Sequence, residues 1–409
     1  MRRIALTTLS LALATSLLQA QAPAPAPAPT PTPTQAPTIS GLVQVWYSQM
    51  MDNNLRLNGT ANYFNGARGE YKENTFSIRR TELKFAGKVS DEVSWEVMID
   101  PTIAASATNN LLQDAALTWK PLKQFEVKLG QFKNIQTLEG VSSSSELQLI
   151  DRSQMANAFG DVRDRGIAFS YLFGDANGLA GKATLASFNG QGKLNDANAQ
   201  KDFAGRLEFT YGKNQKFGFY GLSGSTDQAD KGALVAKTFP GAGAPTGPQV
   251  LDNKDKTTQY GAFYQYQDST WYAAAEGITG QLGRRFASVG TAGGASRQHL
   301  EQKFMGLVLT GAYTINRHTM HLRYDTLNYN SGDQWYGATN PYKTATADFT
   351  PNFTLITAGY TFAFNPAKVK AANLKLNYIL RSKNFLLPRP GQVGEQGGNT
   401  LLAQFQIAF

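Results

Sequence analysis

The acidic and basic residues between positions 133 and 165 are the ones whose types and spacing could do chemistry. Glu139, Glu146 and Asp151 precede Arg152 in one hydrophilic segment. Carboxylates on one side of a narrow water-filled passage, opposite guanidinium and ammonium groups, create a transverse field that favours polar over apolar solutes. In the alternative interpretation, Glu139, Asp151 and Arg152 form ion pairs that fix this segment in place and contact no solute.

Basic residues at other positions are candidates for the opposite side of such a passage. In chain order they are Arg80, Lys84, Lys128, Lys133, Arg206, Arg323 and Arg381. Arg163 and Arg165 flank Asp164, and a guanidinium group can bind phosphate or carboxylate through two parallel hydrogen bonds. A structural Arg–Asp pair is the simpler interpretation of that triplet. These residues indicate contact with small anionic or polar solutes without specifying which one.

Few residues of the chain could support catalysis or metal binding. The chain has no cysteine and three histidines, which removes thiolate catalysis and zinc–thiolate sites. His318 and His321 are three apart, so on a strand they point to opposite faces and cannot bind one metal together. Ser142–Ser145 has no histidine nearby to activate a hydroxyl. We expect no enzymatic activity, no cofactor, no metal site and no nucleic-acid partner.

Alternating apolar and polar residues indicate the elements that position these side chains. Within residues 318–328, Met320 and Leu322 fall on one strand face, and Arg323 and Asp325 fall on the other. This pattern is typical of membrane strands with one lipid face and one face toward a wet lumen. It recurs in residues 93–100, 125–129, 206–211 and 374–381.

The connections between these segments distinguish a membrane barrel from a soluble β-sandwich, whose strands would alternate too. Seven short links alternate strictly with eight long ones. This predicts an all-β fold: a transmembrane antiparallel β-barrel of about sixteen strands, with short periplasmic turns and long extracellular loops. The third long link, residues 133–164, is expected to fold into the lumen.

The two ends of the chain carry separate signals. Residues 1–22 are typical of a secretory signal peptide, with cleavage after Ala20 or Ala22. Residues 21–38 are rich in Pro, Ala and Thr and predict an extended periplasmic linker before the barrel of residues 39–409. At the other end, Phe405, Ile407 and the terminal Phe409 share a strand face. They predict an insertion signal for the barrel assembly machinery.

Three stretches are similar to the phosphate-selective porin O and P family. They are residues 76–101 (FSIRRTELKFAGKVSDEVSWEVMIDP), the LGQFK run at Leu129–Lys133, and the segment from Glu139 through SSSSELQLIDRS to Ser153. The resemblance covers mainly the first third of the mature chain. It implies sixteen strands, a homotrimer and a third loop that folds into the lumen. It also implies a location in the outer membrane of a Gram-negative (diderm) bacterium. Outer-membrane lipid and lipopolysaccharide are expected as further partners.

The expected function is that of an outer-membrane porin for passive diffusion of small hydrophilic solutes. The formal charge of +9 becomes +7 without Arg2 and Arg3 of the leader, which favours anions such as phosphate. A count along the predicted lumen faces gives eight bases and eight acids, and this balance predicts only a modest anion preference without a saturable phosphate site. The bases are Arg80, Lys84, Lys120, Lys128, Arg206, Arg323, Lys375 and Arg381, and the acids are Glu82, Glu96, Asp100, Asp114, Glu126, Glu208, Glu276 and Asp325.

The alternative function is a structural or interaction protein. It would bind a surface partner through its long loops, with the Pro-rich segment as a tether. That role would suit a narrow barrel of about eight strands joined to a soluble anchoring domain. Every part of the chain after residue 38 instead resembles strands and their connections, and sixteen strands enclose an aqueous lumen.

Overall fold

The computed structural model describes residues 36–51, 75–103, 111–175, 178–196, 200–225, 256–282, 287–288, 297–298, 302–328, 331, 352–381, 385–386, 395–396 and 399–409. The predicted signal peptide, and the linker up to residue 35, lie outside these ranges. Most residues of the long connections do so too, except in the third and in the fourth, residues 189–201. Within the described part of the chain, no helix has the length and apolar character to cross a membrane.

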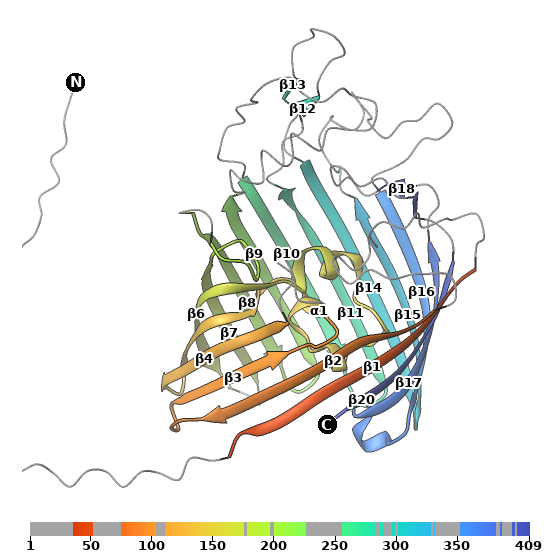
Figure 1. The fold of residues 1–409 in the computed structure, drawn as a ribbon, viewed down its shortest axis with the longest axis horizontal. Helices are drawn as coiled ribbons and strands as arrows, with labels where there is room; N and C mark the ends of the chain where they lie inside the picture. The colour runs from red at the N-terminus through yellow and green to blue at the C-terminus, as the bar shows by residue number, and fades with distance from the viewer. Residues whose placement is uncertain are drawn as a thin grey trace, which may run out of the picture. The chain divides into compact units, whose positions relative to one another are not determined.

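Sixteen antiparallel strands pair in sequence order and close into one barrel (Figure 1). They are β1 (Thr38–Met50), β2 (Thr75–Lys88), β3 (Val93–Ile99), β4 (Leu112–Leu122), β5 (Phe125–Lys133), β6 (Arg163–Gly174), β7 (Leu179–Phe188), β8 (Asp202–Tyr211), β9 (Gln215–Ser225), β10 (Lys256–Gln267), β11 (Trp271–Leu282), β14 (Gln302–Ile315), β15 (His318–Asn328), β16 (Asn352–Ala363), β17 (Ala372–Arg381) and β20 (Thr400–Ala408). This confirms the predicted strand number and the alternation of short and long connections. A barrel of sixteen strands is also wider than the barrel of about eight strands that would suit the alternative function of an interaction protein.

The remaining elements are short. Two-residue strands form two small separate sheets, one from β12 (Ala287–Ser288) and β13 (Arg297–Gln298), the other from β18 (Phe385–Leu386) and β19 (Glu395–Gln396). The 3-10 turn η4 (Pro366–Lys368) lies in the β16–β17 connection, where the Asn365 side chain accepts a hydrogen bond from the Ala367 N–H. None of these elements is part of the barrel wall.

The seam between the first and last strands closes the barrel. β1 pairs with β20 from Leu42 opposite Ala408 to Met50 opposite Thr400. Gly41 and Phe409 exchange two backbone hydrogen bonds, of 2.8 and 3.1 Å. Closure leaves no strand edge, so every strand can satisfy its backbone groups within lipid.

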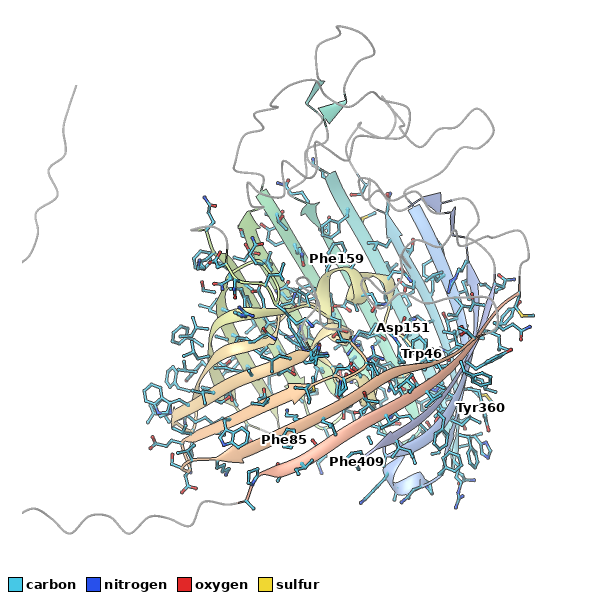
Figure 2. All side chains as sticks on the ribbon, in the orientation of Figure 1. Trp46, Phe85, Asp151, Phe159, Tyr360 and Phe409 are labelled. Atoms are coloured by element: carbon cyan, nitrogen blue, oxygen red, sulfur yellow. The ribbon has the colours of Figure 1, made fainter. Side chains whose placement is uncertain are left out.

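Side chains alternate across the wall as the sequence predicts. On β15, Met320 and Leu322 are more than half exposed on the outer face, whereas His321 and Arg323 are buried inside. Figure 2 shows Tyr360 and Phe409 on the outer side of the strands and Asp151 and Phe159 within the ring that they form. The outward apolar side chains suit contact with lipid tails.

The third long connection lies inside the barrel and contains three short helical segments: α1 (Leu138–Val141), the 3-10 turn η2 (Ser144–Glu146) and the π-helical turn η3 (Ala156–Gly160) (Figure 1). We call residues 134–162 the third loop. The Thr137 hydroxyl caps α1 by accepting a 3.0 Å hydrogen bond from the Gly140 N–H. The apolar residues of this loop explain its inward position.

A hydrophobic core fills one side of the lumen. Ile150, Met155 and Phe159 of the third loop are buried against apolar side chains on the inner faces of β1 and β9–β20. Phe159 stacks on Phe304 of β14, with ring centroids 4.2 Å apart. The wall residues of this core are Trp46, Tyr220, Phe263, Ile278, Phe304, Val308, Leu327, Leu355, Ile379 and Leu402. An apolar inner wall would be unfavourable in a water-filled lumen, and the loop removes it from water.

Candidate functional site

Polar side chains of β1, β17 and β20 hold the middle of the third loop. The Gln44 side chain donates to the Ser144 carbonyl at 3.3 Å, and that of Gln406 donates to the Ser145 carbonyl at 3.1 Å. The Lys375 ammonium group donates to the Leu147 carbonyl. Because backbone carbonyls at a loop turn have no strand partner, these donors satisfy them and fix the loop to this wall.

The opposite ends of the loop are held by β8, β11 and β15. Glu276 accepts a 2.7 Å hydrogen bond from the Leu138 N–H, and Asp325 accepts one of 2.7 Å from the Gln154 N–H. The Arg206 guanidinium donates to the carbonyls of Ile135 and Thr137. The loop therefore crosses the lumen and is attached to the wall on both sides.

Asp161 is the centre of an ion-pair cluster at the base of the loop. Its carboxylate lies 2.9 Å from Arg152, 3.0 Å from Lys133 and 3.9 Å from Arg163. Burial by itself would raise the pKa of Asp161, but the positive charges of Arg152, Lys133 and Arg163 outweigh it and hold the pKa well below its ordinary value. This cluster joins the two ends of the loop where they leave β5 and enter β6.

The acidic residues of the loop are occupied by partners within the protein. Glu139 accepts a 2.6 Å hydrogen bond from the Ser153 N–H and lies 3.4 Å from Arg323. Asp151 accepts from the Arg152 N–H at 2.9 Å. The fully buried Arg152 also donates to the carbonyls of Glu139 and Ser142. These contacts are those of residues that hold the loop in place rather than of an acidic face open to solute.

The other predicted site residues do not form a single group. Arg80 is buried beside Gln44 (2.8 Å) and Glu82 (3.6 Å). Glu146 is exposed and pairs with Lys370 at 3.1 Å in the β16–β17 connection. Arg165 donates to Asn195 at 2.6 Å in the β7–β8 connection, and Arg381 is largely buried at the end of β17. Lys84, Lys128, Lys133, Arg163 and Arg206 line a common cavity.

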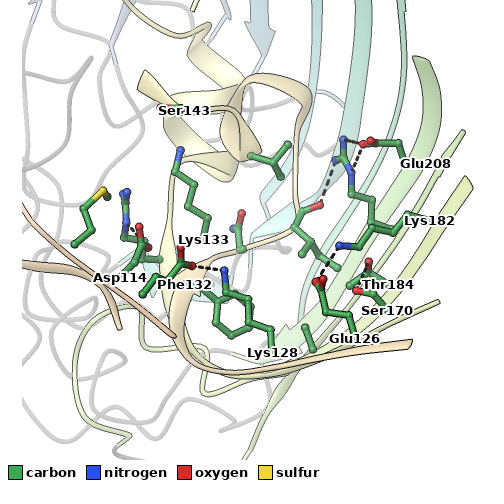
Figure 3. A pocket seen from close by; sticks show the side chains of 18 of the residues that line it. Asp114, Glu126, Lys128, Phe132, Lys133, Ser143, Ser170, Lys182, Thr184 and Glu208 are labelled. Atoms are coloured by element: carbon green, nitrogen blue, oxygen red, sulfur yellow. Dashed lines mark hydrogen bonds and ion pairs between the residues drawn. The ribbon is translucent and has the colours of Figure 1, made fainter. Parts of the chain in front are cut away.

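This cavity, of about 500 Å³, lies between the third loop and the inner faces of β2–β8 (Figure 3). A second cavity of about 450 Å³ reaches toward the short turns after β2 and β4, and both share Glu96, Glu126 and Lys128. We call these two adjoining cavities on one side of the barrel the passage. Its charged lining consists of Lys84, Lys88, Lys120, Lys128, Lys133, Lys182, Arg163 and Arg206 with Glu82, Glu96, Asp114, Glu126 and Glu208.

Three glutamates in this passage are each shared between two bases. The triads are Lys84–Glu96–Lys128 (2.5 and 2.5 Å), Lys120–Glu126–Lys182 (3.2 and 3.1 Å) and Arg206–Glu208–Lys216 (2.9 and 3.3 Å). Each triad has one positive charge more than it has negative charges. The lysine side chains are 28 to 53% exposed, whereas those of the three glutamates are 18 to 24% exposed.

The charge balance predicted for the lumen is therefore wrong for the open passage. The predicted equality of acids and bases was a count over the whole inner wall, but the loop covers part of it. Arg80, Arg323 and Lys375 contact the loop or its anchors, as do Glu276 and Asp325. Strand alternation identifies the inward face but does not reveal which part of that face a loop covers.

Sequence reasoning missed several residues that line the passage or pair with its glutamates. Lys182 of β7 and Lys216 of β9 each complete a triad, and Val141 and Ser143 of the loop line the cavity. Lys182 follows the alternation of β7, where Thr184 and Ala186 share its inward face. That signal could have identified it, but no such pattern marks the loop residues.

A closed sixteen-strand barrel with an apolar outer face, a polar passage and a loop fixed inside the lumen defines an outer-membrane porin. The chain matches the model of the family described as phosphate-selective porin O and P over residues 53–375, and it belongs to that family. It is thus a channel for solute diffusion in the outer membrane of a Gram-negative bacterium.

Solved porin structures share this fold at low sequence identity. The outer-membrane channel DcaP of Acinetobacter baumannii is 13% identical, with a TM-score of 0.56, over 91% of this chain and 97% of that one. The trimer form of OmpT of Vibrio cholerae is 11% identical, with a TM-score of 0.52, over 92% and 100%. An anion-selective porin from Comamonas acidovorans is 11% identical, with a TM-score of 0.51, over 91% and 99%. A comparison with curated proteins found no match.

Proposed function

We propose that small hydrophilic solutes diffuse passively through the passage beside β2–β8, with a modest preference for anions. The observation that carries this proposal is the sharing of each triad glutamate between two bases. A solute in the passage meets the more exposed ammonium groups before the carboxylates between them. The excess positive charge attracts anions and repels cations of the same size.

The same geometry argues against tight capture of phosphate. Each triad lysine already has a carboxylate partner within 3.3 Å, so an incoming anion has to compete with it. In a water-filled passage, charge interactions are screened over roughly 8 Å at physiological salt. We therefore propose steering of anions without a saturable phosphate site.

Reversal potentials in a KCl gradient across a planar bilayer test this proposal. The wild-type channel should pass chloride in preference to potassium, and the preference should fall as total salt rises. The double variant Lys84→Gln with Lys128→Gln removes two charges beside Glu96 and should lower the chloride preference or reverse it. The double variant Lys213→Gln with Lys368→Gln, in two short turns outside the passage, is the control.

Phosphate added from micromolar to millimolar concentration separates steering from capture. Chloride current that decreases only in proportion to the added ions supports the proposal. A block that saturates at low phosphate concentration would contradict it and would indicate a dedicated site. Equal permeabilities of chloride and potassium at low salt would exclude the anion preference itself.

We further propose that the protein is a homotrimer that contacts lipopolysaccharide through its outer surface. The trimer form of the OmpT structure supports the first part. Cross-linking of native outer membranes should give a band of three subunits, and a monomer alone would contradict it. For the predicted export signal, N-terminal sequencing of the mature protein should locate the cleavage site after Ala20 or Ala22.

A further inference from the structure

An apolar surface lines the loop side of the larger cavity. Val141, at the end of α1, is 37% exposed, and Ile135 is half-buried on the same loop. Both line the cavity, and Ile135 also packs against an apolar cluster that contains the buried Phe132 of β5. We call Ile135 and Val141 the apolar platform. Val141 and part of Ile135 leave apolar surface in contact with water, and an apolar ligand in the cavity would cover it.

Ammonium groups line the same cavity as this platform. The Lys128 ammonium nitrogen is 5.3 Å from the centroid of the Phe132 ring and 2.5 Å from Glu96 (Figure 3). Lys84 contacts the same glutamate from β2. On the loop side, the Ser144 hydroxyl is 3.2 Å from Glu82, which shares the inward face of β2 with Lys84. The platform and a pair of positive charges therefore line one small space.

We infer that this cavity is a subsite for small organic anions whose apolar body adjoins a carboxylate. The carboxylate would lie at Lys84 and Lys128, and the apolar body would cover Val141 and Ile135. Such an anion removes apolar surface from water on both sides, which an inorganic anion of the same charge cannot do. A volume of about 500 Å³ is within the range of small-molecule sites. This inference rests on the proposed function, because it assumes that anions enter the passage.

Block of chloride current by benzoate and by acetate tests the inference, since the two anions share a carboxylate and differ in their apolar body. Benzoate should reduce single-channel chloride current with a saturable dependence on concentration, at concentrations at which acetate has little effect. Val141→Ser should raise the half-blocking benzoate concentration about fivefold, because it removes most of one apolar contact. Val141→Leu should retain the block.

The control is Val89→Ser, which changes an exposed valine in the β2–β3 turn outside both cavities. It should leave the block unchanged. Heat-modified mobility in gels verifies that each variant is folded. Equal effects of benzoate and acetate, or a Val141→Ser channel that benzoate blocks as it blocks the wild type, would overturn the inference while the anion preference stands. A folded barrel without ion current would overturn both the inference and the proposed function.

Discussion

At the scale of single residues, the charged groups of this porin have two distinct tasks. Arg152 and Asp161 lie inside a network that joins the ends of the third loop. Lys84 and Lys182 instead reach into the passage with much of their side chains exposed. Removing one partner of a buried ion pair strongly destabilises the folded protein, whereas exposed pairs contribute little to its stability. Substitutions in the two groups should thus have different effects.

Asp161→Asn should destabilise the loop without changing the passage charges directly. It removes the carboxylate beside the buried Arg152, and loss of one partner of a buried ion pair costs about 3 kcal/mol. We expect the variant to lose its folded gel mobility at a lower temperature than the wild type. We also expect a noisier open-channel current. Asp91→Asn, in the exposed β2–β3 turn, is the matched control. An Asp161→Asn barrel as heat-resistant as the wild type would show that the cluster does not hold the loop.

Acid should weaken the same cluster. Because the folded-state pKa of Asp161 is depressed, its contribution to stability is complete above the unfolded pKa of about 4 and is lost as the pH falls below that value. Open-channel noise of the wild type should rise as the pH is lowered below about 4. The Asp161→Asn channel should be noisy at every pH and should change less over this window.

At the scale of elements, strand periodicity and connection length could be predicted from the sequence, and the course of the third loop inside the barrel could not. Alternation alone predicts that Met320 lies on the outer face of its strand and Arg323 on the inner face, as the structure shows. The side of the lumen that the loop covers depends on long-range contacts, such as Phe159 with Phe304. No local pattern encodes such contacts. Many of the charged residues were therefore found in the sequence, although Asp161, Lys182 and Lys216 were not, and neither was the division of the charges between loop anchors and passage.

Shortening the third loop between Ile135 and Ala158 should raise conductance, because this segment occupies the lumen. It should also lower stability, because the apolar inner wall of β9–β20 would then face water. Single-channel recording of the shortened barrel, with circular dichroism to verify its strand content, measures both effects. Unchanged conductance in a folded variant would mean that another segment sets the narrowest point.

At the scale of the whole molecule, Phe409 extends the seam that closes the barrel beyond the pairing of β1 with β20. The Phe409 ring lies over Gly41 of β1, where a β-carbon on the glycine would come within 2.5 Å of the ring. Phe409 and Gly41 also exchange backbone hydrogen bonds. The terminal aromatic residue thus belongs both to the predicted insertion signal and to the seam that joins the first and last strands.

Replacing Phe409 with Asp should impair assembly while leaving export intact. The variant places a charge where an apolar ring covers the seam, and it alters the terminal aromatic residue of the predicted signal. Its level in the outer membrane should fall, with unfolded chain in the periplasm, as cell fractionation would measure. Gly311→Ala, which adds a methyl group in open space on β14, is the control. A normal outer-membrane level of the Asp variant would place the assembly signal elsewhere.

The apolar side of the third loop also has a consequence for biogenesis. Glu276 binds the Leu138 N–H and Asp325 binds the Gln154 N–H. The loop can therefore reach its final position only after strands that lie more than a hundred residues later in the chain have formed. Before those strands form, Ile150, Met155 and Phe159 lack the apolar wall residues against which they pack in the barrel. The unfinished chain should consequently depend on periplasmic holdase chaperones more strongly than the same chain with these three residues changed to serine. Pulse-chase degradation in a chaperone-depleted strain would measure that dependence.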